Sequence, residues 1–123
     1  MKDFHDVELV LYEAGLTPQE FGFWIDPDET VGALVASGHV VVGWISLEWR
    51  HVAPPPDFIL KGASHLVAPI DPRRLRKAIK RARARGIARL QTCRFCEQRF
   101  NPGWMHNDEV CQGCAERHLR VVH

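Results

Sequence analysis

The chain has 123 residues, of which 46% are hydrophobic and 25% are charged. This length and balance fit one globular domain or two very small ones, and exclude a disordered tail, a collagen-like repeat and a multidomain enzyme. The formal net charge of +1 hides a strong asymmetry. Residues 1–72 contain eleven Asp and Glu against three Lys and Arg, a net charge of −8, whereas residues 73–123 contain four against thirteen, a net charge of +9.

Two features bear on the compartment. Residues 1–6 show no apolar segment behind a basic start, so we expect no signal peptide and a cytoplasmic protein. Residues 30–47 carry no charge over eighteen positions, the lower limit for a transmembrane helix. The first half of this run is typical of a helix and the second half of a strand, and a spanning helix needs one conformation throughout. We therefore predict no membrane insertion.

Helix signals dominate the first part of the chain. Apolar residues recur at helical spacing over residues 6–14, and Gly15 is typical of the residue that follows a helix. Residues 17–20 (TPQE) form a capping box with proline at the first helical position, which predicts a second short helix. Residues 26–29 (DPDE) repeat this pattern and predict a third helix that ends at Gly38.

Two strands should follow these helices. Residues 40–49 are β-branched and aromatic, which predicts a buried strand, and residues 58–67 are the expected return strand. Three helices and a hairpin make an α+β lobe, with Trp24, Trp44 and Trp49 in its core. The same order fits a winged helix-turn-helix, but the negative charge of this segment opposes a fold that reads DNA.

The clearest helix of the sequence is strongly basic. Asp71 is its predicted N-cap, Pro72 its first residue and Gly86 its end. A narrow apolar stripe can pack on a core, and it consists of Leu75, Ala78, Ile79 and Ala82. The cations, all candidates for contact with nucleic acid, are Arg73, Arg74, Arg76, Lys77, Lys80, Arg81, Arg83 and Arg85. Two other interpretations of these cations remain open: the helix docks on the acidic half of the chain, or its basic face is simply solvated.

Two Cys-x-x-Cys pairs carry the strongest functional signal. Cys93 and Cys96 form the first pair, and Cys111 and Cys114 form the second, fourteen residues further on. Each pair can bind an ion through a tight turn, and together they complete a tetrahedral site, which predicts one structural Zn2+. Redox chemistry would need one pair in a βαβ unit, and catalytic zinc would need an open ligand position, so both are disfavoured.

The residues around the cysteines indicate the type of zinc module. Residues 101–103 (NPG) predict a type II turn between strands near 97–100 and 104–106, and the residues after the second pair favour a helix. A knuckle, a hairpin and a helix that begins at the second pair resemble a treble-clef zinc finger over residues 93–123. This resemblance implies the ligand role for the four cysteines. Glu97 departs from it, because such knuckles often have glycine there.

The predicted zinc site needs support from its surroundings. Four thiolates give Zn2+ a net negative charge, which Arg94, Arg99 and Arg117 are placed to offset. The expected miniature core consists of Phe95, Phe100, Trp104, Val110 and Leu119. A module this small buries little apolar surface, so metal binding should contribute on the order of 10 kcal/mol to its folding.

The remaining polar residues give weaker signals. His106-Asn107-Asp108 resembles part of a His-Asn-His nuclease site, but the gap between the cysteine pairs leaves little room for a second metal, and a turn is the simpler interpretation. A metal-dependent nuclease is therefore a minority hypothesis, and no catalytic residue is assigned. Other histidines show no ligand spacing and are expected to be surface or core residues: His5, His39, His51 and His65.

These patterns predict three segments: an acidic lobe over residues 1–70, a basic helix over 71–86 and a zinc-binding module over 87–123. The predicted function is a non-enzymatic, zinc-stabilised protein that contacts nucleic acid through the basic helix and the module. The alternative is a protein-interaction or inhibitor module that uses the acidic lobe, with its clustered Asp26, Asp28 and Glu29. We expect neither a membrane partner nor a small-molecule substrate.

Overall fold

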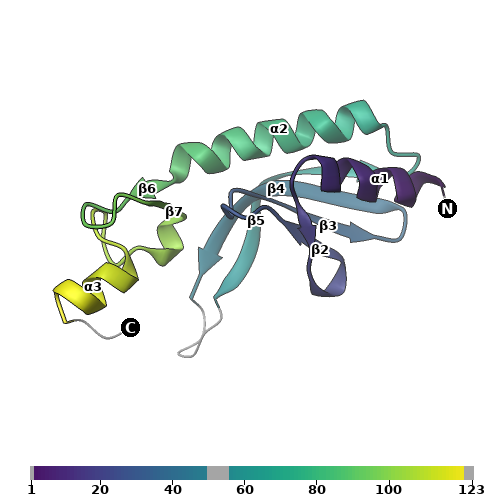
Figure 1. Cartoon of the computed structure of the whole chain (residues 1–123). Coiled ribbons are helices and arrows are strands. Elements are labelled where there is room, and N and C mark those ends of the chain that lie inside the picture. The colour runs from purple at the N-terminus through teal and green to yellow at the C-terminus, as the bar shows by residue number, and fades with distance from the viewer. Residues whose placement is uncertain (1, 50–55, 121–123) are drawn as a thin grey trace.

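The computed structural model describes residues 2–49 and 56–120, which form an N-terminal lobe and a smaller cysteine-rich module (Figure 1). This part of the chain contains three α-helices and an antiparallel sheet of five strands. The lobe consists of α1 (Lys2–Glu13), β1 (Thr17–Pro18), β2 (Phe23–Ile25), β3 (Val31–Ala36), β4 (His39–Glu48), β5 (Asp57–Val67) and α2 (Pro72–Arg89). The module consists of β6 (Gln91–Thr92), β7 (Arg99–Phe100), a 3-10 turn (Pro102–Trp104) and α3 (Gln112–His118).

The core of the lobe lies between the sheet and the two long helices. The strands are hydrogen-bonded in chain order from β1 to β5, and α2 crosses the face formed by β3 and β4 (Figure 1). The predicted apolar stripe of α2 faces inward, with Leu75 and Ile79 buried against Val7 and Leu11 of α1. Asp71 caps α2 as predicted, because its carboxylate accepts a hydrogen bond from a backbone N–H of the first turn at 2.9 Å.

Two of the three helices predicted before residue 40 are wrong. Helix α1 is present, and Gly15 after it has a positive φ of 88°. Residues 17–20, however, contribute to β1 and the 3-10 turn Glu20–Gly22, and residues 31–36 are strand β3. Asp26 caps the β2–β3 turn instead of a helix, since its carboxylate accepts hydrogen bonds from the backbone N–H groups of Thr30 and Val31 at 2.7 and 3.0 Å. With both helices absent from these segments, the winged helix-turn-helix order is also wrong.

The uncharged run of residues 30–47 forms β3, a tight turn and most of β4. Within the described ranges, no helix combines the length and the apolar character needed to cross a bilayer. The strands predicted at residues 40–49 and 58–67 are confirmed as β4 and β5. Residues 50–55, between β4 and β5 in the sequence, lie outside the described part of the chain.

The sheet is strongly curved at a pair of glycines. Gly32 of β3 faces Gly43 of β4, and a Cβ on Gly43 would lie 2.6 Å from a carbonyl oxygen of β5. In a flat sheet, strands three positions apart are separated by about 14 Å. Here the rings of Phe23 in β2 and Phe58 in β5 approach to 6.1 Å between centroids. The face away from the helices is therefore concave, and the missing side chains at the two glycines permit this bend.

Helix α2 continues beyond Gly86, its predicted end, to Arg89. Gly86 is buried, and a Cβ at this position would lie 2.1 Å from the carbonyl oxygen of Thr30. This glycine therefore does not end the helix. It allows the helix to approach the backbone at the start of β3.

The cysteine-rich module packs against the end of β4 near the C-terminus of α2 (Figure 1). Buried Asn101 donates hydrogen bonds from Nδ2 to the carbonyl oxygen of Glu29 at 3.0 Å and to a carbonyl oxygen of β4 at 2.9 Å. Trp49 Nε1 donates to the carbonyl oxygen of Gly103 at 2.8 Å, and its ring meets Trp104 edge-on. Trp49, predicted for the core of the lobe, is 41% exposed and contacts the module instead.

Candidate metal centre and basic groove

The sulfur atoms of Cys93, Cys96, Cys111 and Cys114 all lie within 4.8 Å of one another. Zn–S bonds of about 2.3 Å in a tetrahedron place sulfurs about 3.8 Å apart, and the Cys96 and Cys111 sulfurs are 4.0 Å apart. Three of the cysteines are buried, and Cys96 is partly exposed. The predicted four-cysteine cluster is thus confirmed, with a geometry consistent with one zinc ion.

The first cysteine pair lies on the β6–β7 hairpin. The Cys93 N–H donates to the carbonyl oxygen of Gln98 at 2.9 Å, and the Glu97 N–H donates to that of Cys93 at 2.8 Å, which closes the knuckle. Glu97 has a positive φ of 61°, a conformation that favours glycine. The hairpin predicted around residues 101–103 is wrong, because β7 pairs with the preceding β6 and residues 102–104 form a 3-10 turn.

The second pair is at the N-terminus of α3, as predicted. Cys111 is the N-cap, and its sulfur accepts a hydrogen bond from the backbone N–H of Cys114 at 3.4 Å. An isolated β-bridge from Met105 to Cys111 ties the start of this helix to the chain after the 3-10 turn. The second pair is therefore positioned by a helix cap and by one strand-like contact.

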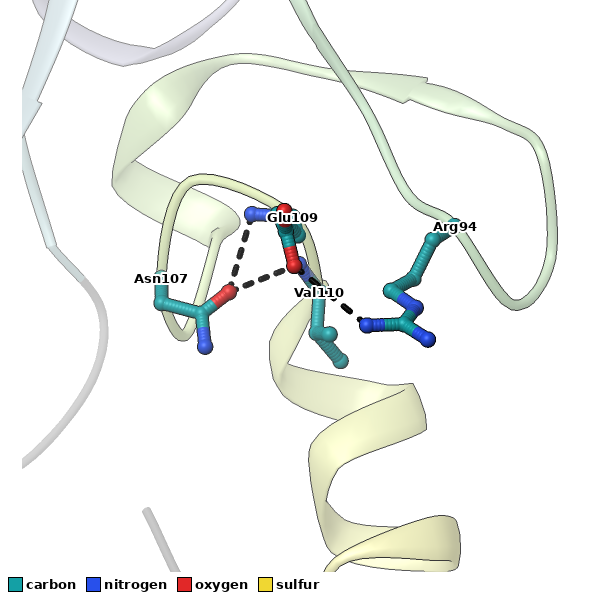
Figure 2. Close-up of polar contacts among 4 residues, drawn as sticks. All are labelled: Arg94, Asn107, Glu109 and Val110. Carbon is teal, nitrogen blue, oxygen red and sulfur yellow. Dashed lines mark hydrogen bonds and ion pairs between the residues drawn. The ribbon is translucent and has the colours of Figure 1, made fainter.

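A polar turn joins the two pairs (Figure 2). Asn107 Oδ1 accepts hydrogen bonds from the backbone N–H groups of Glu109 and Val110, both at 2.9 Å. Arg94, next to Cys93, forms an ion pair of 3.4 Å with Glu109 and donates its backbone N–H to the Glu109 carbonyl oxygen at 2.7 Å. The triplet of residues 106–108 thus belongs to a turn that Asn107 closes.

The three arginines expected to offset the cage charge have different roles. Arg117 donates to the sulfur of Cys114 at 3.2 Å. Arg94 is paired with Glu109, and Arg99 donates to the carbonyl oxygen of Ile87 near the end of α2 at 3.2 Å. The expectation is met by Arg117, whereas Arg94 and Arg99 connect segments of backbone.

The pKa values of the thiols differ within the cage. Burial raises the pKa of Cys93, but hydrogen bonds from the backbone of Cys111, Cys96 and Phe95 outweigh it and lower this pKa to about 6. At Cys114, burial and the neighbouring thiols raise the pKa to about 12. Without an ion, Cys93 is therefore the first thiol of the cage to lose its proton as the pH rises. A bound dication would supply the positive charge that stabilises all four thiolates.

The miniature core differs from the expected set. The buried residues around the cysteines include Val110 as predicted, together with Met105 and Ala115, and Phe100 packs against them. The prediction that Phe95 and Leu119 belong to this core is wrong, since their side chains are 42% and 48% exposed. The Phe95 ring stacks on His118 at the surface, with centroids 4.6 Å apart. Met105 could have been found from its position among the apolar residues between the two pairs.

The cations of α2 divide into groups with different surroundings. Arg74, Lys77 and Arg81 line a groove of about 290 Å3 together with Ser64, His65 and Leu66 of strand β5. We call this the basic groove. Arg73, Arg76 and Lys80 are exposed outside it.

Other arginines of α2 serve the fold. Arg83 is half-buried and donates to the carbonyl oxygen of Ala14, at the end of α1. Arg85 packs close to Gly62 of β5. Arg89, which the sequence did not single out, lies over the Trp44 ring at 4.3 Å from its centroid. Arg83 and Arg85 thus have structural surroundings that the charge pattern did not reveal.

Two of the three clustered acidic residues of the lobe form hydrogen bonds within the chain. Asp26 is buried in its turn. Glu29 has a positive φ of 57°, and its Oε1 accepts a hydrogen bond from Trp104 Nε1 at 2.6 Å. Burial raises the pKa of Glu29. Asp28 is exposed.

Comparisons with known proteins add no further assignment. No family model, no curated protein and no solved structure matches this chain. The cysteine cluster and the surfaces around it are therefore the features of this chain that bear on its function.

Proposed function

We propose that this chain is a non-enzymatic nucleic-acid-binding protein whose module is held by one structural zinc ion. The observation that carries the binding proposal is the basic groove, where Arg74, Lys77 and Arg81 lie on one side of α2 beside β5. The zinc proposal rests on the four clustered sulfurs.

The donor set favours zinc among the common metals. Four thiolates in a tetrahedron suit Zn2+ or iron, and a closed set of four ligands is typical of structural zinc. The proposed class is a treble clef. Its support is the first pair on a hairpin knuckle and the second pair at a helix N-terminus.

The basic groove suits a phosphate backbone. Positions 74, 77 and 81 follow one another at helical spacing, so their cations form a row about 10 Å long. Strand β5 is the last strand of the sheet, and its residues 64–66 line the groove beside this row. Each phosphate that contacts a cation releases condensed counterions, which makes such binding strong at low salt and weak at high salt.

The residues that line the basic groove predict little preference for a particular nucleotide sequence. Three cations and the hydroxyl of Ser64 are among the seven described residues that line the groove, and such groups bind phosphates and sugars more than base edges. Two aromatic residues of the module have ring partners within the chain: Phe95 stacks on His118, and Trp104 meets Trp49 edge-on. We therefore expect phosphate contacts to dominate the affinity.

The test uses the zinc-loaded full chain and labelled single-stranded and double-stranded DNA and RNA at two salt concentrations. Changing Arg74, Lys77 and Arg81 together to Ala should abolish most binding at low salt and reduce the salt slope by about 2–3. The matched control changes Arg73, Arg76 and Lys80 to Ala, which removes the same charge from the same helix outside the groove. Equal loss in both variants, or no binding by the wild type, would exclude the basic groove as a nucleic-acid site.

Two other outcomes bear on the remaining hypotheses. Cleavage of the labelled strands with Mg2+ or Mn2+ would favour the nuclease. Binding of a basic protein to the acidic lobe, instead of nucleic acid to the basic groove, would favour a protein-interaction module. The inhibitor hypothesis has less support from the lobe, because Asp26 and Glu29 are held by contacts within the chain.

A further inference from the structure

We infer that His39 and His65 form a second metal site, separate from the cysteine cage, which binds one divalent transition-metal ion and leaves coordination positions open. His39 begins β4, and His65 lies in β5. In the β4–β5 ladder, His39 faces Val67 and His65 faces Val41, so the two histidines are diagonal neighbours on one face of the sheet.

The two imidazoles already have the separation that a shared ion requires. His65 Nδ1 and His39 Nε2 are 3.3 Å apart, and the ring centroids are 5.4 Å apart. Two imidazole nitrogens that each bind a tetrahedral ion at about 2.0–2.1 Å lie about 3.3–3.4 Å from each other. Without a metal, the N–H of one ring donates a hydrogen bond to the unprotonated nitrogen of the other. A metal ion can replace that proton with little movement of the rings.

The backbone that carries the pair is well ordered by hydrogen bonds. Strands β4 and β5 pair from His39 to Glu48, and the Ala68 N–H donates to the carbonyl oxygen of Gly38 at 2.9 Å, next to His39. Little conformational entropy is then lost when both imidazoles bind the same ion. His65 is exposed and His39 partly exposed, so an ion can reach both nitrogens from solvent.

The number of ligands defines the class of site. Among the described residues, the cysteine cage is the one group of three or more side chains close enough to share an ion. The histidine pair therefore supplies two ligands, and water fills the other positions. Imidazole suits Zn2+, Ni2+ and Cu2+ more than Mg2+ or Ca2+. This site is open and exchangeable, unlike the closed cage.

The test is calorimetric titration of the tag-free, zinc-loaded full chain with Ni2+, followed by measurement of retained zinc. We expect one Ni2+ to bind without loss of zinc, and His39→Ala and His65→Ala each to weaken binding at least about tenfold, because each leaves a single imidazole. His118→Ala, which removes an exposed histidine of the module, is the matched control. A second readout is the side-chain nitrogen NMR spectrum, in which added Zn2+ should shift the signals of His39 Nε2 and His65 Nδ1.

Failure of the wild type to bind Ni2+ would overturn the inference. So would unchanged affinity in either of the two variants, since the ion would then have its ligands elsewhere. None of these measurements involves nucleic acid, so the result does not depend on the proposed function.

Discussion

The lobe and the module reach stability by different means. Among the described residues, the core of the lobe contains thirteen buried apolar residues, most of them contributed by both long helices and the sheet. The buried cluster of the module contains six residues, of which three are cysteines. Burial of apolar surface can stabilise the first, whereas the second has too little of it and needs the ion that its cysteines would hold. Mostly polar contacts through Asn101, Trp49 and Trp104 join the two.

Removal of the metal should have the largest effect and should separate the two regions. Metal binding contributes on the order of 10 kcal/mol to small zinc modules, so chelation should unfold residues 91–118 and leave the lobe folded. Amide NMR spectra before and after chelation test this, with metal content checked by elemental analysis. If the amide signals of the module persist in metal-free protein, the module does not depend on a metal ion for its fold.

Shortening a buried side chain of the lobe should destabilise the lobe and leave the zinc-binding module loaded. Leu75 is fully buried between α2 and the sheet, and Leu75→Ala should cost about 2–5 kcal/mol through lost burial and a cavity. Denaturant unfolding monitored on the lobe should show this loss, while the stoichiometry of bound zinc stays at one. Leu119→Ala, at a half-exposed position, is the control and should change stability by less than about 0.5 kcal/mol.

The junction between the regions should depend on Asn101. Asn101→Ala removes both donors to the lobe and the acceptor for the Gly103 N–H, which should cost about 1–3 kcal/mol for the buried groups left without partners. Asn101→Asp keeps the acceptor and loses the two donors, so it separates docking from turn formation. We expect both variants to release zinc to a chelator faster than the wild type does. Release rates equal to that of the wild type would show that docking on the lobe does not support the cysteine cage.

A smaller effect is expected at Glu97 in the first knuckle. Because this residue has a φ of 61°, Glu97→Gly should relieve backbone strain and stabilise the loaded module by about 0.5–1 kcal/mol. Competition for zinc with a chelator measures this as tighter retention. Glu97→Ala, which keeps a Cβ, should give no such gain.

The smallest predicted effect is pH-dependent and concerns Glu29. Its pKa is raised by burial, so its protonated form is favoured by folding, and this contribution is lost as the pH rises through the raised pKa. Glu29→Gln keeps an acceptor for Trp104 Nε1 without the charge. The variant should match the wild type below pH 4 and be slightly more stable at pH 7, as thermal unfolding at both pH values can measure.

Several features were recognisable from local patterns. The apolar stripes of α1 and α2, the Asp71 cap and the spacing of the cysteine pairs each involve residues within one or two turns of chain. The β-branched run of β4 and its return strand were also found. At residues 17–36 the same reasoning failed, since capping signals such as that of Asp26 serve turns and helices alike.

The amino-acid order alone was sufficient for the four clustered cysteines and for the basic helix, because neighbouring residues produce a knuckle or an amphipathic face without distant partners. The identity of β3, the bend at Gly32 and Gly43, the sorting of cations into the basic groove and the meeting of His39 with His65 arose from the folded chain. Each depends on which strand pairs with which, and pairing is chosen by the burial of a whole sheet against two helices, a property that no short segment carries.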